Sequence, residues 1–329
     1  MPLFPPPGPA APARGTPARL TAMAPGDLLL RTRGLTKRYP DVVAVEDLDV
    51  EVPRGRVGLV GANGAGKTTL FRMMLGLSHP TDGSIEVCGV DVAADPIGAR
   101  SRLGYMPEHE CLPLDQSAAD VVGTHGELSG LTARAARQRA SDVLDLVGLD
   151  EARFRPIAGF STGMRQRAKL AQALVADPEV VLLDEPTAGL DPLGREEMLG
   201  LVARLGTLGI SVLLATHLLD DVQQVCDHVV MLDAGRLVVA GPTGSLLEGT
   251  GALTLDVGPD SGALVALLGD RSLEVTLVHD LLEVQIASED ELDVVRDAVA
   301  ELGLPLHRMS TRLASLDEVF LDRAGGSRP

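Results

Sequence analysis

Residues 61–68 read GANGAGKT, which has the residue types and the spacing of a phosphate-binding loop. The loop follows an apolar strand-like stretch at 56–60 and opens a stretch with helical spacing. Glycines let backbone N–H groups surround phosphates, Lys67 can reach the β- and γ-phosphates, and the Thr68 hydroxyl can hold Mg²⁺. A glycine-rich loop without a ligand is the alternative, and the strand–loop–helix context disfavours it. The residues expected to bind the nucleotide here are Gly61, Asn63, Gly64, Ala65, Gly66, Lys67, Thr68 and Thr69.

A second chemically suggestive stretch, VVLLDE, ends in Asp184 and Glu185. Because the carboxyl ends of parallel strands meet at one edge of a sheet, Asp184 is predicted to lie near the Mg²⁺. Glu185 is predicted to point elsewhere and to polarise an attacking water. An acidic pair that only caps a helix is the alternative, and the nearby phosphate loop favours the catalytic interpretation.

The stretch FSTGMRQR at 160–167 looks like half of another binding site. Ser, Thr and Gly precede a long stretch with helical spacing, and free N–H groups at a helix start attract anions. Since the chain already has a phosphate loop about a hundred residues earlier, this second anion site needs a separate explanation.

The elements that must position these residues follow from composition and apolar patterning. Hydrophobic residues make up 45% of the 329 residues but aromatics only 2%, so the core must consist of aliphatic side chains and Met. The apolar runs have strand length, which is too short to span a bilayer, and we expect no leader and a cytosolic location. Cys88, Cys111 and Cys226 form no CxxC pair and are expected to be reduced thiols.

The charge distribution argues against a nucleic-acid partner. The formal net charge is −17, and residues 246–329 carry 16 acidic and 6 basic side chains, a balance of −10. A protein that binds the phosphate backbone needs the opposite sign.

Three regions are expected along the chain. Residues 1–26 contain eight of the 22 prolines and read as a disordered tail, part of which would be absent if translation started at Met23. Residues 27–245 alternate strands with helices, with a helical subdomain at about 110–175, which predicts an α/β fold with a mainly parallel sheet. Residues 246–329 follow the β-α-β-β-α-β order of a small α+β ferredoxin-like domain, and a closing helix follows at SLDEVFLDRA.

With the phosphate loop, FSTGM and LLDEPTAGLDP in this order, residues 28–245 resemble the ATP-binding cassette (ABC) family of ATPases. The resemblance implies a P-loop NTPase cassette that hydrolyses ATP with Mg²⁺. It also accounts for the second helix start, which in this family is the signature motif. Ser161 and Gly163 would bind the γ-phosphate held by the phosphate loop of a second subunit, so two chains would close head-to-tail around two ATP molecules.

Other family positions match individual residues. The resemblance implies that Tyr39 stacks on adenine, that Asp191 contacts the other subunit, and that His217 touches the γ-phosphate. The alternatives are that Tyr39 is a core residue and that His217 has only a structural role. Lys67, Glu185 and His217 would therefore form the catalytic group.

The chain departs from the family pattern at three positions of these motifs. Thr162 and Met164 replace the usual Gly and Gln of the signature, and nucleotide binding is expected to persist with altered closure. Glu108 stands where the family has Gln. With Thr68 and Asp184 it is expected to lie near Mg²⁺, where its charge can tighten the binding of the ion or weaken it by repulsion.

The implied function is that of an ATP-binding subunit of a membrane transporter. The subunit would dimerise, dock on a separately encoded polytopic permease and lie peripherally on the inner face of the cell membrane. The ending ASLDEVFLDRA resembles cassette subunits of bacterial exporters for drugs and antibiotics. A soluble cassette ATPase with a non-transport partner is the alternative. Residues 246–329 would be an accessory domain, for regulation or for dimerisation.

Overall fold

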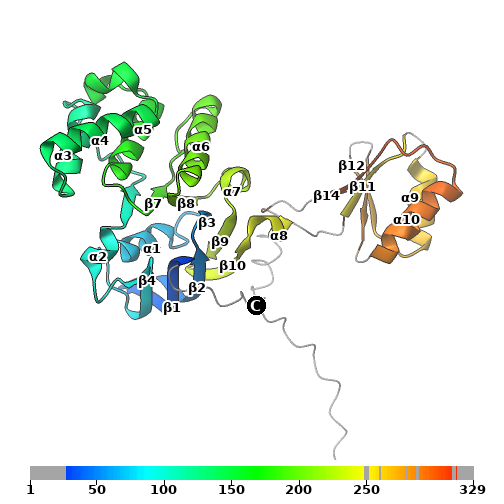
Figure 1. Ribbon diagram of the computed structural model, residues 1–329. Helices are drawn as coiled ribbons and strands as arrows, with labels where there is room; N and C mark the ends of the chain where they lie inside the picture. The colour runs from blue at the N-terminus through cyan, green and yellow to red at the C-terminus, as the bar shows by residue number, and fades with distance from the viewer. Residues whose placement is uncertain are drawn as a thin grey trace, which may run out of the picture.

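The computed structural model describes residues 27–247, 252–258, 261–278, 281–286, 289–312 and Leu316 (Figure 1). A six-stranded sheet has the order β10-β9-β3-β8-β7-β6, in which only the β9–β10 pair is antiparallel. Its strands are β3 (Arg56–Val60), β6 (Leu103–Met106), β7 (Val180–Asp184), β8 (Ser211–Thr216), β9 (His228–Asp233) and β10 (Arg236–Pro242).

Both faces of this sheet are buried, because its strands are continuous apolar runs. Successive residues of β7 and β8 point to opposite faces. Val181 and Leu183 pack on one side with the helices α3–α7, whereas Val180 and Leu182 pack on the other side with α1. The helices are α1 (Lys67–Met74), α2 (Pro96–Arg100), α3 (Ala118–Leu128), α4 (Ala133–Leu146), α5 (Thr162–Leu174), α6 (Pro192–Thr207), α7 (Leu219–Val225) and α8 (Thr243–Leu247).

A second, antiparallel sheet covers the other side of α1 (Figure 1). Its order is β2-β1-β4-β5, with β1 (Leu28–Tyr39), β2 (Val42–Pro53), β4 (Asp82–Val87) and β5 (Val90–Asp91). The apolar side chains of β1 and β2 close the core over α1, and this places the end of β1 beside the start of α1.

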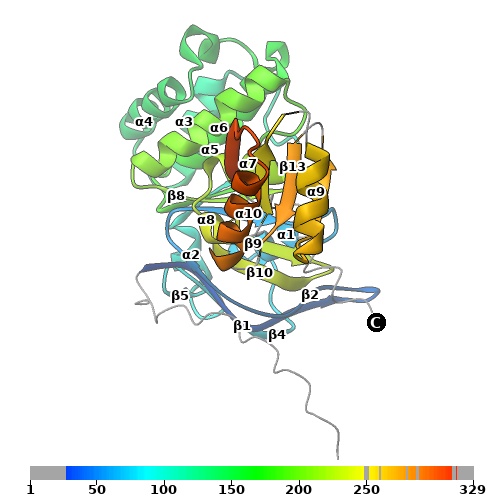
Figure 2. The same cartoon turned by 90° about the vertical axis from the view of Figure 1, so that its right-hand side faces the viewer.

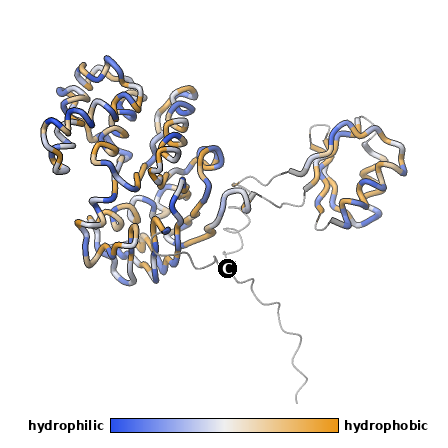
Figure 3. Tube along the Cα trace, viewed as in Figure 1, coloured by the Kyte–Doolittle hydropathy of each residue, from blue (hydrophilic) through white to orange (hydrophobic). Residues whose placement is uncertain are grey.

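Between β6 and β7 the chain is helical. Side-chain oxygens of Ser117, Thr132 and Ser161 cap α3, α4 and α5 by accepting from backbone N–H groups in the first turn. Two 3₁₀ turns, Asp150–Phe154 and Ile157–Gly159, lead into α5. In Figure 3 hydrophobic and hydrophilic residues alternate along these helices, as expected where one face is buried.

The C-terminal strands form a third sheet of order β12-β13-β11-β14, all antiparallel. Helices α9 (Ser261–Asp270) and α10 (Glu289–Glu301) lie on one face of it (Figure 2). This is the ferredoxin-like order expected from the sequence. The strands are β11 (Ala252–Asp256), β12 (Val275–Val278), β13 (Leu281–Gln285) and β14 (Arg308–Arg312).

The predicted fold class is confirmed, with small differences. Strand β6 and helix α2 are too short to stand out in the sequence. The closing helix lies outside the described residues apart from Leu316, which belongs to the buried core on the face of the six-stranded sheet that packs with α3–α7. Within the described ranges, no helix combines the length and apolar character needed to cross a membrane.

Candidate functional site

The phosphate loop connects β3 to α1 and is shaped by its glycines. Gly66 has φ 104° and caps α1, and a Cβ atom there would come within 2.4 Å of the Ala44 carbonyl oxygen. Only glycine fits this position, because other residues clash and rarely adopt a positive φ. The start of α1 is thereby left open toward a pocket of about 400 Å³.

This pocket collects most of the predicted nucleotide-binding residues. Glu108, Asp184 and Glu185 line it together with the loop, and Tyr39 lines it as well. The Lys37 ammonium lies over the Tyr39 ring, 5.1 Å from its centroid, and Tyr39 is 38% exposed. Gly61 contributes its carbonyl group to Lys67. The lining residues are Tyr39, Val42, Ala44, Ala62, Asn63, Gly64, Ala65, Gly66, Lys67, Thr68, Thr69, Glu108, Asp184 and Glu185.

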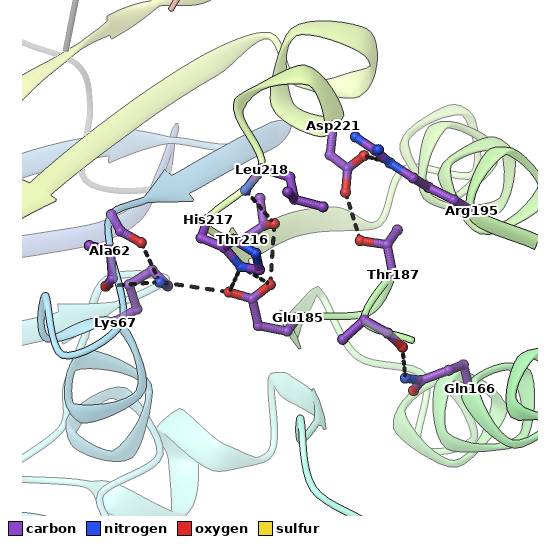
Figure 4. Close-up of polar contacts among 12 residues, drawn as sticks. Ala62, Lys67, Gln166, Glu185, Thr187, Arg195, Thr216, His217, Leu218 and Asp221 are labelled. Atoms are coloured by element: carbon purple, nitrogen blue, oxygen red, sulfur yellow. Dashed lines mark hydrogen bonds and ion pairs between the residues drawn. The ribbon is translucent and has the colours of Figure 1, made fainter. Parts of the chain in front are cut away.

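Lys67 is buried at the centre of the pocket. Its Nζ donates to the carbonyl oxygens of Gly61 at 2.5 Å and Ala62 at 3.3 Å, and it lies 3.7 Å from a Glu185 carboxylate oxygen (Figure 4). The loop that would wrap the phosphates therefore holds the ammonium group within reach of them.

The cation end of the pocket contains Thr68 and Asp184. The Thr68 hydroxyl donates to Asp184 Oδ2 at 3.1 Å. Burial is the main cause that raises the pKa of Asp184. The hydrogen bond from Thr68 opposes the rise, and the charge of Glu108 adds to it. A bound cation would offset this cost of keeping Asp184 ionised.

This donor set fits Mg²⁺ held jointly with a phosphate. Among the described residues no group of three or more His, Cys, Asp or Glu side chains forms a metal cage. Mg²⁺ usually binds through one or two carboxylates, substrate phosphates and water rather than through a protein cage. Thr68 and Asp184 are suited to that arrangement, and Glu108 lies on the exposed wall of the same pocket.

Glu185 follows β7 directly, in the left-handed region with φ 48°. Its N–H group donates to the Ala215 carbonyl at 2.9 Å, which holds this uncommon conformation in place. The side chain points toward Lys67 and His217 (Figure 4). His217 Nδ1 lies 3.0 and 3.1 Å from the two carboxylate oxygens, and the Thr216 hydroxyl donates to one of them at 3.3 Å.

The His217 loop is fastened to the chain that follows Glu185. Fully buried Asp221 accepts from the Thr187 hydroxyl at 2.7 Å and from Arg195 Nε at 2.5 Å (Figure 4). Thr187 is two residues beyond Glu185, and Asp221 is four beyond His217. This network holds the two loops that carry Glu185 and His217 in one arrangement.

We expect the Asp221→Asn substitution to destabilise the protein and to lower kcat. The amide keeps an acceptor for Thr187 but leaves Arg195 without its carboxylate, which costs about 1–3 kcal/mol in the free energy of unfolding. Urea unfolding and steady-state ATPase assays measure both effects. Asp220→Asn, at the exposed neighbouring position, is the control, and equal effects at both positions would contradict the assigned role.

The signature residues form a different pocket of about 390 Å³. Ser161 caps α5 by accepting from the Met164 N–H at 3.2 Å, and Asp191 caps α6 by accepting from the Gly194 N–H at 3.0 Å. Ser161, Gly163 and Asp191 all line this pocket, and none lines the pocket of the phosphate loop. One chain therefore does not bring its predicted site residues together.

Three polar residues of this region were not anticipated from the sequence. Thr216 and Asp221 flank His217, and their roles depend on contacts with residues about thirty positions away. Lys169 lies midway along α5, where a helical pattern alone suggests a solvent-exposed lysine. Its burial follows from the packing of α5 against the segment after β6.

Comparison with known proteins agrees with this geometry. The sequence profile of the ABC transporter family matches residues 45–188. The daunorubicin resistance ATP-binding protein DrrA3 of Streptomyces coeruleorubidus is 38% identical over 92% of this chain and 98% of its own length. The Nod factor export ATP-binding protein I of Cupriavidus metallidurans is 33% identical over 90% of this chain and 97% of its own length. Among solved structures, cbiO1 of Clostridium perfringens, part of the ABC transporter complex cbiONQ, superposes with a TM-score of 0.61 at 28% identity, covering 67% of this chain and 90% of that one.

Proposed function

Because this chain belongs to the ABC transporter family of ATP-binding proteins, we propose that it forms a head-to-tail homodimer that drives a separate membrane permease in export. The chain is an ATPase that uses Mg²⁺, as its family membership establishes. The observation that carries the proposal is the division of the site between two pockets of one chain. The phosphate loop with Glu185 lines one pocket, and Ser161 with Gly163 lines the other.

In the proposed mechanism Glu185 orients and activates the attacking water. Its carboxylate is held by Thr216 and His217 on one side and by the charge of Lys67 on the other. Lys67 then moves from the loop carbonyls to the phosphates, where it stabilises the charge of the transferring phosphoryl group. Mg²⁺ held by Thr68 and Asp184 would neutralise the same charge.

His217 is suited to act between Glu185 and the γ-phosphate. Its side chain is 49% exposed, whereas Glu185, which it contacts, is buried. An imidazole in this position can bond to a phosphate oxygen with one nitrogen while Nδ1 keeps its contact with Glu185.

Two chains arranged head-to-tail would complete both sites. Ser161 and the N–H groups at the start of α5 would then face the γ-phosphate held by the partner, where the helix start favours negative charge. Asp191, which lines the same pocket, would contact the partner next to it. Closure would depend on ATP in both sites.

A groove of about 600 Å³ is suited to a helix or loop of the permease. Ile97 and Leu128, which are 72% and 80% exposed, stand on its walls. Tyr105 and Pro107 also line it, three residues and one residue before Glu108 of the nucleotide pocket. A segment docked in this groove would respond to changes at the nucleotide.

The relatives support export, since one is a daunorubicin resistance ATP-binding protein and another a Nod factor export ATP-binding protein. We place the dimer on the inner face of the cell membrane, where a permease would hold it. Residues 246–329 are assigned as an accessory domain for regulation or dimerisation. No nucleic-acid partner is assigned, in keeping with the acidic composition.

The Glu108→Gln substitution is expected to weaken Mg²⁺ binding. An exposed carboxylate in the same partly solvated pocket as a bound Mg²⁺ would contribute on the order of 1 kcal/mol. The Mg²⁺ concentration for half-maximal ATPase activity should therefore rise roughly threefold to tenfold. Glu110→Gln, two residues along and outside this pocket, is the control. A lower Mg²⁺ requirement in Glu108→Gln would mean that repulsion dominates.

Purification of a tagged Glu185→Gln form from its native membranes with Mg-ATP tests the proposal. A polytopic membrane protein in roughly equal amount is expected, and Leu128→Asp should abolish its recovery without changing ATP hydrolysis by the isolated subunit. Recovery of a ribosome or another soluble complex without a membrane protein would overturn the transport proposal and support the non-transport alternative.

A further inference from the structure

Lys169 is a buried cation outside the nucleotide pocket. It lies midway along α5, and only 3% of its surface is exposed. Its Nζ donates to three consecutive carbonyl oxygens, those of Pro107 at 2.8 Å, Glu108 at 2.9 Å and His109 at 3.4 Å. An ammonium group has three N–H donors, so the three carbonyls match its full capacity.

Lysine is rare in this chain, which makes its placement informative. Lys37, Lys67 and Lys169 are the only three lysines among 29 basic residues, and arginine is used elsewhere. Arginine presents a flat fork of donors, whereas an ammonium group can bond to several oxygens that converge on one point. The three carbonyls of residues 107–109 form such a convergent group.

The segment held by Lys169 lies between two functional surfaces. Glu108 lines the nucleotide pocket, and Pro107 lines the groove on the other side. Just before them, the Tyr105 hydroxyl lies 3.5 Å from Asp184 Oδ2. Burial and the charge of Asp184 raise the pKa of Tyr105 to about 12, so it remains a neutral donor. A shift of residues 107–109 therefore changes the position of Glu108 relative to Asp184.

Ser161 caps the N-terminal end of the same helix. Lys169 lies eight positions after Ser161, which corresponds to about 12 Å along the helix axis. The helix between them is uninterrupted, so Ser161 and Lys169 move together. A movement of the α5 start toward a bound phosphate must then move the Lys169 ammonium and the carbonyls bonded to it.

We propose that Lys169 is a positioning residue that links the two nucleotide sites of the dimer. It fixes residues 107–109 to α5, so that binding of a partner's nucleotide at Ser161 sets the position of Glu108 in the chain's own pocket. The inference rests on the proposed head-to-tail dimer. It assigns to the Lys169 side chain the contact between α5 and residues 107–109.

The test compares Lys169→Met with Lys37→Met in the full chain. Lys37 bonds to one carbonyl oxygen, that of His79 at 2.8 Å, and is not among the residues that line the nucleotide pocket. In a Glu185→Gln background, amide hydrogen exchange of residues 108–111 is measured with and without Mg-ATP. Lys169→Met should speed this exchange at least tenfold, and Mg-ATP should no longer slow it when the dimer closes. Lys37→Met should change neither the exchange rate nor its slowing by Mg-ATP.

With Glu185 intact, Lys169→Met should lower kcat roughly 10-fold to 100-fold, as expected for a small misplacement of an active-site group. Mg-ATP binding by the dilute monomer should change less than threefold. In the double variant of Lys169→Met and Ser161→Ala, the loss in kcat should be smaller than the product of the two single losses. In the double variant of Lys169→Met and Tyr39→Ala, the two losses should multiply. If Lys169→Met proves too unstable, Lys169→Gln keeps one donor group and should show intermediate losses.

A folded Lys169→Met protein with unchanged exchange and unchanged kcat would overturn the inference. So would a loss of ATP binding by the monomer that matches the loss in kcat, because Lys169 would then act only within its own site. Failure of the Glu185→Gln form with Lys169 intact to dimerise on Mg-ATP would instead overturn the proposed function. The two failures are therefore distinguishable.

Discussion

The Glu185→Gln substitution is expected to lower kcat by about 10²- to 10⁴-fold, the usual contribution of a general base. The amide has nearly the same shape, so the contacts of this position with Thr216 and His217 change little in geometry. It cannot accept a proton from water at neutral pH. The expected result is thus a protein that binds Mg-ATP but hydrolyses it very slowly.

The same substitution should stabilise the closed dimer. Closure depends on ATP in both sites, and slow hydrolysis keeps ATP there. Size-exclusion chromatography with Mg-ATP should show a dimer for Glu185→Gln and mainly monomer with Mg-ADP, while phosphate release measures kcat. Glu110→Gln, at an exposed glutamate outside the pocket, is the control. Hydrolysis near the wild-type rate in Glu185→Gln would show that another group activates the water.

The Gly163→Asp substitution is expected to abolish hydrolysis without unfolding the chain. A Cβ atom at Gly163 meets only Leu190 Cδ2, at an ordinary contact distance of 3.8 Å, so the isolated subunit has room for a side chain. In a closed dimer the new carboxylate would face the partner's γ-phosphate. Repulsion and the loss of close backbone approach should lower kcat at least 100-fold, as measured by phosphate release, with an unchanged thermal midpoint of unfolding.

Mixing this variant with Lys67→Ala tests the composite site. Each variant alone should be inactive, because Lys67→Ala lacks the phosphate-binding ammonium in both sites of its dimer. A mixed dimer has one site with both defects and one site with neither. Equal amounts should therefore recover up to about a quarter of the wild-type activity if the sites act independently. No recovery, although mixed dimers form, would contradict the head-to-tail arrangement.

The phosphate loop was predictable from the sequence because its function depends on local geometry. Residues 61–68 are contiguous, and the positive φ of Gly66 and the buried start of α1 are consequences of that short stretch. The strands of the central sheet were predictable for a similar reason, since an apolar run such as 180–183 has few other stable environments.

The roles of Lys169 and Asp221 were not predictable, because both depend on contacts between distant segments. Lys169 is sixty residues or more from the carbonyls that it holds, and Asp221 is 34 residues from Thr187. A lysine in an amphipathic helix normally has its charge in water. Its burial becomes favourable only where packing supplies acceptors for all its donors.

The sequence by itself thus determined the fold class, the order of the ferredoxin-like strands and the nucleotide chemistry, because local spacing and apolar periodicity encode these features. Only the tertiary structure decided which site residues share a pocket. It brought Lys67, Asp184 and Glu185 together and left Ser161, Gly163 and Asp191 in a separate pocket. The physical reason is that the central sheet gathers strand ends at one edge, whereas the helical subdomain holds the start of α5 away from that edge.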